Sequence, residues 1–228
     1  KLLTELCKID GFHWIRVLYG YPDRVTDSLL EVMAREPKVV KYIDLPLQHA
    51  SGRVLKEMNR NGNFDSLCAL MQRIRSKVPG VVLRTTLIAG FPGETEEDFE
   101  QLCEFVRAVR FERLGCFAYS QEEDTPAGER EDQVDPQVRM HRADLVMEEQ
   151  MDIAFQMGKE LVGKKLEVLV EGYDDEQQMY YGRSYMDAPD IDTRTSFVTE
   201  QEEVQVGDFV WGEVLDSVGY DLIGRQIG

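Results

Sequence analysis

The chain has 228 residues, of which 26 are Lys or Arg and 43 are Asp or Glu, so its formal net charge is −17. Hydrophobic residues make up 43% of the chain, which is enough for a packed core and excludes an intrinsically disordered protein. A surface this acidic repels nucleic acid except at a local basic patch, so the charge favours a basic protein as partner.

The chain begins with Lys1 rather than Met, and we expect it to be a piece of a longer protein. No run of about 18 apolar residues predicts a membrane-spanning helix, and no signal-peptide pattern is present. The cysteines are widely spaced and form no CxxC pair, so they predict neither a zinc site nor a disulfide framework. They are Cys7, Cys68, Cys103 and Cys116. We therefore expect reduced thiols in or near the core of a cytoplasmic protein.

Strands and helices are expected to alternate over the first 120 residues. After a helix within residues 1–10, apolar runs predict four buried strands, at residues 14–19, 39–45, 81–89 and 114–119. The segments between the strands carry apolar residues at helical spacing, with N-cap signals at Thr26, at Asn63 or Asp65, and at Thr95. This alternation predicts parallel strands with helices outside them and functional groups at their carboxyl ends.

The pattern changes after a long helix that is expected from Asp135-Pro136 to about Leu161. Five short alternating segments follow and predict a small antiparallel barrel of the OB type. They are residues 165–170, 179–184, 196–199, 208–215 and 220–223. The predicted fold class is therefore α/β, with part of a parallel barrel in residues 1–160 and the small barrel in residues 161–228. Residues 159–228 carry 6 Lys or Arg against 16 Asp or Glu, so the small barrel is the more acidic part.

The strongest local signal lies in residues 83–95. Arg84 falls inside a strand expected to be buried, so it needs a carboxylate partner, either from a ligand or from a residue such as Asp44. Gly90 and Gly93 would let the backbone approach a ligand and leave N–H groups free at a helix start. The alternative is a plain joint between strand, turn and helix.

A second signal follows the strand at residues 39–45. Gln48 and His49 come at its carboxyl end, where ligand contacts collect in parallel folds. The Gln48 amide both donates and accepts hydrogen bonds, which suits a ribose or an amino acid head group. The alternative for His49 is a structural histidine or a residue at a helix start.

A third signal is the acidic loop of the small barrel, with Asp187, Asp190 and Asp192 around Pro189. These carboxylates are either a solvated acidic turn or a docking site for Lys and Arg of a partner protein. The sequence contains no GxGxxG or Walker loop and no GxSxG elbow, so it shows no dinucleotide, P-loop or serine-hydrolase signature.

Six segments together resemble the radical S-adenosylmethionine (SAM) methylthiotransferase family. They are WIRVLYGYP, YIDLPLQHAS, VLKEMNR, LRTTLIAGFPGETEEDFE, RLGCFAYSQEEDTPA and YGRSYMDAPDID. LQHAS, LGCFAYS and GRSxxDAPDID resemble the RimO-like branch, which adds a methylthio group to the β-carbon of an aspartate on a small-subunit ribosomal protein. The alternatives are a tRNA methylthiotransferase (MiaB-like), which would need a basic stripe on the small barrel, or a non-catalytic binding module.

The resemblance implies a radical-SAM (β/α) barrel of which only the later strands are present, followed by a complete TRAM domain. It also implies SAM and two 4Fe–4S clusters in the intact enzyme, and an electron donor as a partner. The CxxxCxxC motif that binds the radical-SAM cluster is absent, and none of the four cysteines matches a cluster ligand. We therefore expect no metal ligand in this chain, which alone should be inactive.

The resemblance further implies which residues face the cofactor, while the catalytic residues stay unknown. The expected cofactor-binding residues are Gln48, His49, Arg84, Thr86, Ile88, Gly90 and Phe117. In the intact enzyme, reductive cleavage of SAM would give a 5′-deoxyadenosyl radical that takes hydrogen from the aspartate Cβ, and sulfur from the auxiliary cluster would then bond to that carbon. The cofactors carry this chemistry, which explains why no acid–base pair stands out.

Overall fold

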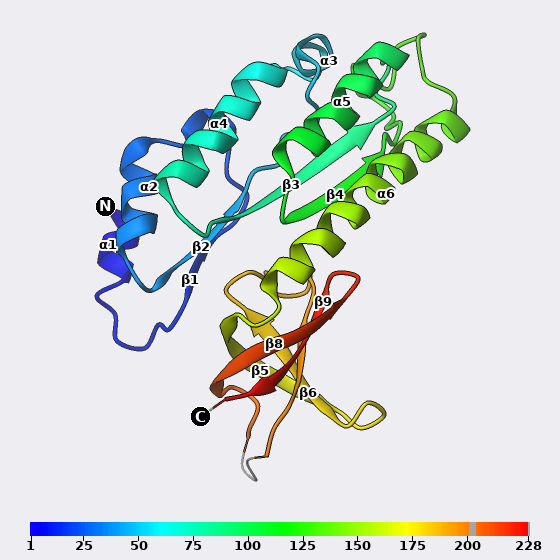
Figure 1. The fold of residues 1–228 in the computed structure, drawn as a ribbon. Helices are drawn as coiled ribbons and strands as arrows, with labels where there is room; N and C mark the ends of the chain where they lie inside the picture. Colours follow the sequence, from blue (N-terminus) through cyan, green and yellow to red (C-terminus); the bar gives the residue numbers. More distant parts are fainter. Residues whose placement is uncertain (201–203, 228) are drawn as a thin grey trace.

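A computed structural model describes residues 1–200 and 204–227 (Figure 1). Its first half contains a four-stranded parallel sheet in the order β1-β2-β3-β4. The strands are β1 (Ile15–Val17), β2 (Val39–Asp44), β3 (Val82–Ala89) and β4 (Arg113–Ala118). The predicted parallel α/β arrangement is confirmed, and the strand bounds differ from the expected ones by up to two residues.

The helices between the strands begin where the sequence places their caps. Thr26 and Asn63 accept backbone hydrogen bonds at their helix starts, and Thr95 forms a capping box with Asp98. The helical segments are α1 (Leu2–Leu6), the 3-10 turn η1 (Pro22–Arg24), α2 (Asp27–Arg35), α3 (Gly52–Glu57), α4 (Phe64–Lys77), α5 (Glu96–Val109) and α6 (Pro136–Leu161). Helix α3 was not predicted from the sequence, because its six residues are too few to show a helical period.

The helices cover one face of the parallel sheet (Figure 1). Along β3, Leu83, Thr85 and Leu87 are buried on this side, whereas the alternate residues Arg84, Thr86 and Ile88 are only partly buried on the other. We call this second side the inner face. The expectation of strands buried on both faces is therefore wrong for the carboxyl half of β3, because none of the described helices covers its inner face.

The second half of the described chain forms a closed five-stranded barrel in the order β5-β6-β7-β9-β8. Its strands are β5 (Lys165–Asp174), β6 (Met179–Ser184), β7 (Thr195–Val198), β8 (Phe209–Val218) and β9 (Asp221–Gln226). The small barrel was predicted to be antiparallel, but β7 and β9 pair in parallel. The reason is topological, because strand directions cannot alternate all the way around a closed barrel with an odd number of strands. The predicted range 161–228 also includes residues 201–203 and 228, which lie outside the described residues.

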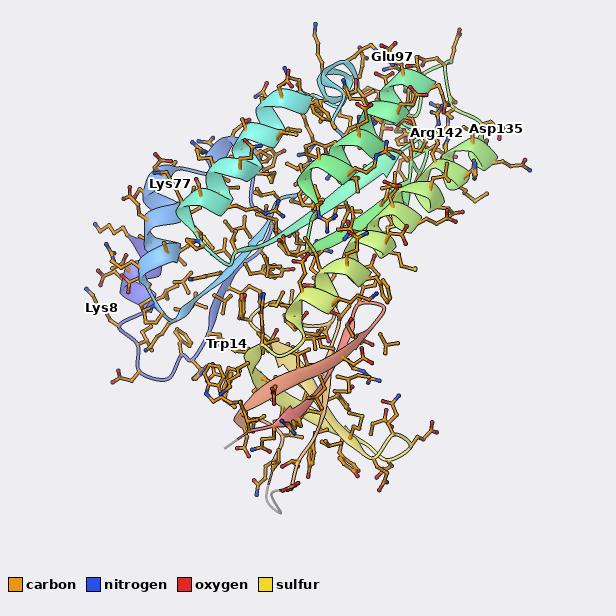
Figure 2. The ribbon with its side chains drawn as sticks, viewed as in Figure 1. Lys8, Trp14, Lys77, Glu97, Asp135 and Arg142 are labelled. Atoms are coloured by element: carbon orange, nitrogen blue, oxygen red, sulfur yellow. The ribbon has the colours of Figure 1, made fainter. Side chains whose placement is uncertain are left out.

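The small barrel packs on the amino-terminal part of the inner face. Val40 and Val82 join one apolar cluster with Leu166 and Met186 of the small barrel. Trp14, which precedes β1, lies at this boundary with its ring edge-on to Phe209, 4.9 Å between centroids (Figure 2). The contact covers the amino-terminal part of the inner face and leaves the carboxyl ends of the strands open.

The four cysteines lie where the sequence predicts them. Cys103 and Cys116 are buried, and burial raises the pKa of the Cys103 thiol to about 11 and that of Cys116 to about 12. Cys7 and Cys68 are partly buried, so the predicted core or near-core placement is confirmed. Among the described residues, none of the helices combines the length and the apolar character needed to cross a bilayer.

Helix α6 touches the small barrel at a glycine, which gives a test of the packing. A Cβ at Gly158 would lie 2.6 Å from Ser217 Oγ on β8. Gly158→Ala should lower the free energy of unfolding by about 1–3 kcal/mol through overpacking, although alanine favours helix. Urea unfolding followed by circular dichroism measures this. Gly11→Ala is the control, because nothing lies within 4 Å of its Cβ position, and equal stability of the two variants would contradict the packing.

Candidate functional site

Four of the predicted cofactor-facing residues come together at the carboxyl end of the inner face. They are Gln48, Thr86, Ile88 and Phe117. Thr86 of β3 pairs with Gly115 of β4, and Ile88 pairs with Phe117, so Thr86, Ile88 and Phe117 lie on the same side of the sheet. The Phe117 side chain is 61% exposed, which is unusual for an aromatic residue inside a parallel strand. Gln48 lies beside them, since its N–H donates to Thr86 O at 2.9 Å and its carbonyl accepts from Ile88 N at 2.7 Å.

Pro46 explains why Gln48 reaches this place. The strand leaves the ladder after Leu45, and the Thr85 hydroxyl replaces the lost pairing by donating to Leu45 O at 2.8 Å and accepting from Leu47 N at 3.3 Å. Gln48 then rejoins β3 with a positive φ of 72°. A non-glycine residue held in this conformation is uncommon and frequently marks a functional segment.

Two further aromatic side chains lie beyond the carboxyl end of β1, the edge strand opposite β4. Tyr19 and Tyr21 follow β1 and are 73% and 56% exposed. Tyr19 has a positive φ of 57°, and its backbone N–H donates to Asp44 Oδ2 at 3.1 Å. With Phe117 on β4, exposed rings thus lie at the carboxyl ends of both edge strands of the sheet. The Tyr21 ring already has the Arg60 guanidinium over it, 5.2 Å from its centroid.

His49 lies beneath this surface and not on it. Its side chain is fully buried, and the Ser51 backbone N–H donates to Nδ1 at 2.9 Å. Because a backbone amide can only donate, Nε2 must carry the proton that it shares with Glu94 Oε2 at 3.2 Å. Both ring nitrogens are thus satisfied inside the protein, which supports the structural interpretation of His49.

Glu94 connects His49 to the turn after β3 and to α6. Its fully buried carboxylate also accepts from Gly90 N at 2.8 Å and pairs with Arg142 Nη1 at 2.8 Å. The prediction of a free N–H at Gly90 is therefore wrong, because this N–H donates to Glu94. The prediction of a free N–H at Gly93 is also wrong, because Gly93 N donates to Asp132 O at 2.8 Å. A Cβ at Gly90 would lie 2.4 Å from Arg139 Cγ, so α6 accounts for the close approach that this glycine permits.

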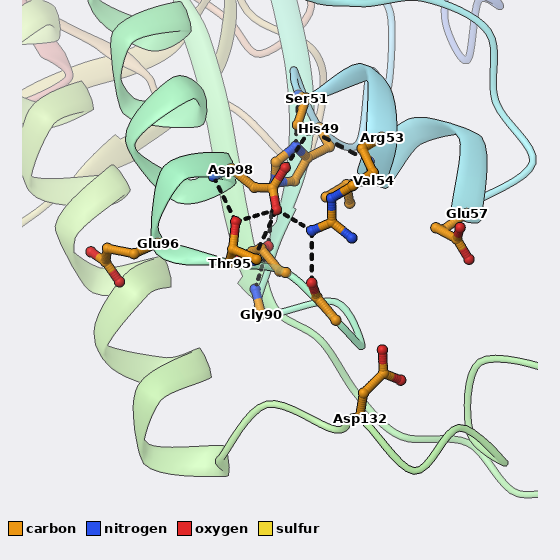
Figure 3. Close-up of polar contacts among 12 residues, drawn as sticks. His49, Ser51, Arg53, Val54, Glu57, Gly90, Thr95, Glu96, Asp98 and Asp132 are labelled. Atoms are coloured by element: carbon orange, nitrogen blue, oxygen red, sulfur yellow. Dashed lines mark hydrogen bonds and ion pairs between the residues drawn. The ribbon is translucent and has the colours of Figure 1, made fainter.

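A second buried carboxylate, Asp98, holds the loop before α3 against α5 (Figure 3). It accepts from Ser51 Oγ at 2.6 Å, from Thr95 Oγ1 at 2.6 Å and from Arg53 Nη2. Burial alone would raise the pKa of this carboxyl, but the hydrogen bonds from Arg53, Ser51 and Thr95 outweigh it and hold the pKa well below its usual range. These bonds brace the segment that carries Gln48.

Arg84 lies below the open surface, inside an ionic network. Its Nη1 binds Asp44 Oδ1 at 2.9 Å, which confirms the predicted partner, and its Nε lies 3.5 Å from Asp192 Oδ1 of the small barrel. A ligand carboxylate is therefore not needed to neutralise Arg84. We call the set Arg16, Tyr42, Asp44, Arg84, Arg113, Asp187 and Asp192 the inner-face network.

The structure contradicts the docking site that was predicted in the acidic loop of the small barrel. The side chains of Asp187 and Asp192 are only 2% and 4% exposed, and each pairs with an arginine of the parallel sheet. They cannot receive cations from a partner, because burial hides them and arginines already neutralise them. Of the three predicted docking residues, Asp190 alone is exposed.

Sequence reasoning missed the residues that complete these clusters. Glu94 and Arg142 are 48 positions apart, and Arg113 pairs with a carboxylate 74 positions later. One signal was available, because Arg113, like Arg84, stands in an apolar strand and needs an acidic partner. The partner could not be chosen without knowing where the small barrel packs.

A metal site is not among the described residues. In residues 1–200 and 204–227, no three His, Cys, Asp or Glu side chains lie close enough together to hold a metal ion. The four cysteines belong to the packed parts of the structure and do not fit a 4Fe–4S cluster.

Comparisons with known proteins match two parts of the chain to family models. Residues 1–106 match the model of the radical SAM superfamily, and residues 162–227 match the TRAM domain. The chain therefore carries radical SAM sequence and TRAM sequence over these two ranges. The predicted likeness to radical SAM methylthiotransferases is confirmed by the relatives described next.

Several curated relatives carry the same name, "Ribosomal protein uS12 methylthiotransferase RimO". The protein from Lachnoclostridium phytofermentans is 48% identical over 224 residues, which are 98% of this chain and 51% of the relative. The proteins from Thermoanaerobacter sp. and Desulfitobacterium hafniense are 49% and 47% identical and cover 99% and 100% of this chain and 51% of each relative. The chain thus spans about half the length of the relatives it matches.

The Asp98 cluster predicts a stability that depends on pH. Asp98→Asn should lower the free energy of unfolding at pH 7 by about 1–3 kcal/mol, because the neutral amide loses charge-assisted hydrogen bonds. The pKa of Asp98 is lower in the folded state, so the stabilisation is complete above pH ~4 and is lost as the pH falls through the folded pKa. The difference between variant and wild type should therefore shrink below pH ~4.

Urea unfolding between pH 2.5 and 7 measures this difference. Glu97→Gln is the matched control, since Glu97 is an exposed carboxylate in the same first turn of α5. An Asp98→Asn difference that stays constant over this range would contradict the assignment.

Proposed function

We propose that the chain is part of a radical-SAM methylthiotransferase that adds a methylthio group to the β-carbon of an aspartate on ribosomal protein uS12. The observation that carries the proposal is the 46–49% identity to curated uS12 methylthiotransferases along nearly the whole chain. The division into a radical-SAM part, residues 1–160, and a TRAM domain, residues 161–228, belongs to the same proposal. Such an enzyme would act in the cytoplasm, where its substrate is assembled.

The open inner face is the surface that would receive the nucleoside of SAM. Ile88 and the exposed Phe117 offer apolar area for the adenine, and the Thr86 hydroxyl and Gln48 amide offer hydrogen bonds to its polar groups. SAM bound beside a reduced iron–sulfur cluster supplies the radical chemistry of this superfamily. The intact enzyme would carry two such clusters on residues outside this chain and would need an electron donor.

The residues of this chain would bind and orient, and would transfer no proton. His49 and Glu94 are buried in mutual contact, and Arg84 is neutralised by Asp44 and Asp192, so none of them is free to act as an acid or base at the open surface. Their part is to hold the backbone of Gln48, Thr86 and Ile88 in place. A fixed surface of this kind positions a reactive cofactor and shields it from water.

The charge of the chain supports a basic protein substrate. Exposed carboxylates follow β4 directly, at the same end of the sheet as the open surface. They are Glu122, Glu123, Asp124, Glu129, Glu131 and Asp132. Long-range attraction from these groups would speed the encounter with a basic ribosomal protein and would repel tRNA.

The proposal is tested with the full-length enzyme, reconstituted with clusters and incubated with reductant, SAM and uS12. Mass spectrometry of uS12 should show a methylthio group on one aspartate. Phe117→Ala should lower the rate about 5- to 100-fold, since stacking of a base on an aromatic ring is worth about 1–3 kcal/mol. Met140→Ala is the matched control, because Met140 is a similarly exposed apolar residue on the outer helix α6.

The same reaction with tRNA in place of uS12 separates the two substrates. A methylthio group on tRNA and none on uS12 would overturn the proposed substrate and keep the enzyme class. Product on neither substrate with a fully loaded enzyme would overturn the enzyme class. Equal rates for Phe117→Ala and Met140→Ala would remove Phe117 from the cofactor surface.

A further inference from the structure

We propose that Asp187 and Asp192 are positioning residues, which hold Arg113 and Arg84 from the small barrel and thereby join the two parts of the chain into one cooperative unit. The small barrel would then be a structural component of the inner face, beyond any role in binding substrate. This inference rests on the contacts of the described residues and does not depend on the proposed reaction.

Arg113 depends on the small barrel most directly. Its Nη2 lies 2.5 Å from Asp187 Oδ1, and the two side chains are 11% and 2% exposed. Within the described part of the chain, Asp187 is the one carboxylate at salt-bridge distance from Arg113. A buried guanidinium without a carboxylate partner destabilises the folded state, so the buried position of Arg113 on β4 depends on the contact with the small barrel.

Arg84 is shared between the two parts of the chain. Asp44 on the neighbouring strand binds its Nη1, and Asp192 of the small barrel faces its Nε at 3.5 Å. Both carboxylates are almost fully buried, with side chains 1% and 4% exposed. The second carboxylate determines which way the planar guanidinium turns, because each edge of its fork then faces a separate acceptor.

The same loop also reaches the first two strands. The Tyr42 hydroxyl donates to Asp192 Oδ2 at 2.6 Å, and the Arg16 guanidinium lies over the Tyr42 ring at 4.4 Å. Arg16 Nη1 also donates to Tyr185 O of the small barrel at 2.8 Å. All four parallel strands are thus connected to the segment between β6 and β7.

The two aspartates are held ready for these contacts by their own loop. Asp187 Oδ2 accepts from Ser184 N at 3.2 Å and from Ser184 Oγ at 2.9 Å, and Asp192 Oδ2 accepts from Ala188 N at 2.8 Å. Asp190 takes a positive φ of 63° at the turn between them. The carboxylates are therefore fixed before they meet the arginines, which lowers the entropy lost on contact.

This arrangement connects the small barrel to the open surface. Arg84 lies two residues before Thr86 and four before Ile88 on the same face of β3. Removing the Asp192 charge leaves Arg84 with Asp44 alone and frees its Nε edge. The guanidinium should then move, although the backbone hydrogen bonds of β3 remain.

A double-mutant cycle on Arg113 and Asp187 tests the cooperative unit. In urea unfolding of the 228-residue chain, Arg113→Met and Asp187→Asn should each raise the equilibrium constant for unfolding about 100-fold. The double variant should raise it no further than the larger single change. Effects that multiply in the double variant would overturn the proposal.

The control cycle uses Arg107 and Glu149, an exposed ion pair between α5 and α6 with side chains 53% and 36% exposed. Arg107→Met and Glu149→Gln should each change the constant less than about fivefold. A coupling there as large as that between Arg113 and Asp187 would also overturn the proposal, because the buried pair would then contribute no more than an exposed one.

A second measurement reports on position and not on stability. The NMR signal of the Arg84 Nε–H is assigned by its absence in Arg84→Lys, and its exchange with water is measured in Asp192→Asn and in the exposed control Asp190→Asn. Asp192→Asn should speed the exchange at least about tenfold with unchanged circular dichroism, while Asp190→Asn should not. An unchanged Arg84 signal in folded Asp192→Asn would contradict a positioning role.

Discussion

Two arginines on the inner face of a parallel sheet impose the constraint on which the rest of the structure depends. A guanidinium that is largely removed from water must be paired, or the folded state pays its full desolvation cost. Asp44 supplies one carboxylate from within the sheet, but Arg113 and the second edge of Arg84 face carboxylates of the small barrel. The place and orientation of the small barrel follow from this requirement together with the apolar contact around Val40 and Val82.

The constraint divides the inner face into a closed and an open part. The small barrel and the inner-face network cover the amino-terminal half of the strands, while Thr86, Ile88 and Phe117 remain partly or largely exposed beyond them. Behind the open part, the buried Glu94 and Asp98 join α3, α5 and α6 and leave the loop that carries Gln48 little freedom. A rigid, ligand-accessible end is what a fold needs when cofactors supply the reactivity and the protein supplies position.

The sequence predicted the local features well and the long-range ones poorly. Caps at Thr26, Asn63, Thr95 and Asp135 were readable because a cap depends on neighbours within one turn. The pairing of Arg84 with Asp44 was readable because both interrupt apolar strands. The roles of Asp187 and Asp192 were not, because a loop rich in acids has the same sequence whether it faces water or two arginines. The free N–H expected at Gly90 was wrong, because Glu94, four residues later, accepts from it. The close neighbour of this glycine, Arg139, lies 49 positions further along the chain and could not be predicted.

If the parallel sheet and the small barrel form one unit, they unfold together, and native-state hydrogen exchange of the 228-residue chain tests this most directly. The most protected amides of β3 and β8 should exchange only by global unfolding, with the same opening free energy and the same dependence on urea. Exchange of the β8 amides through an opening that leaves β3 protected would contradict the claim, because the small barrel would then unfold by itself.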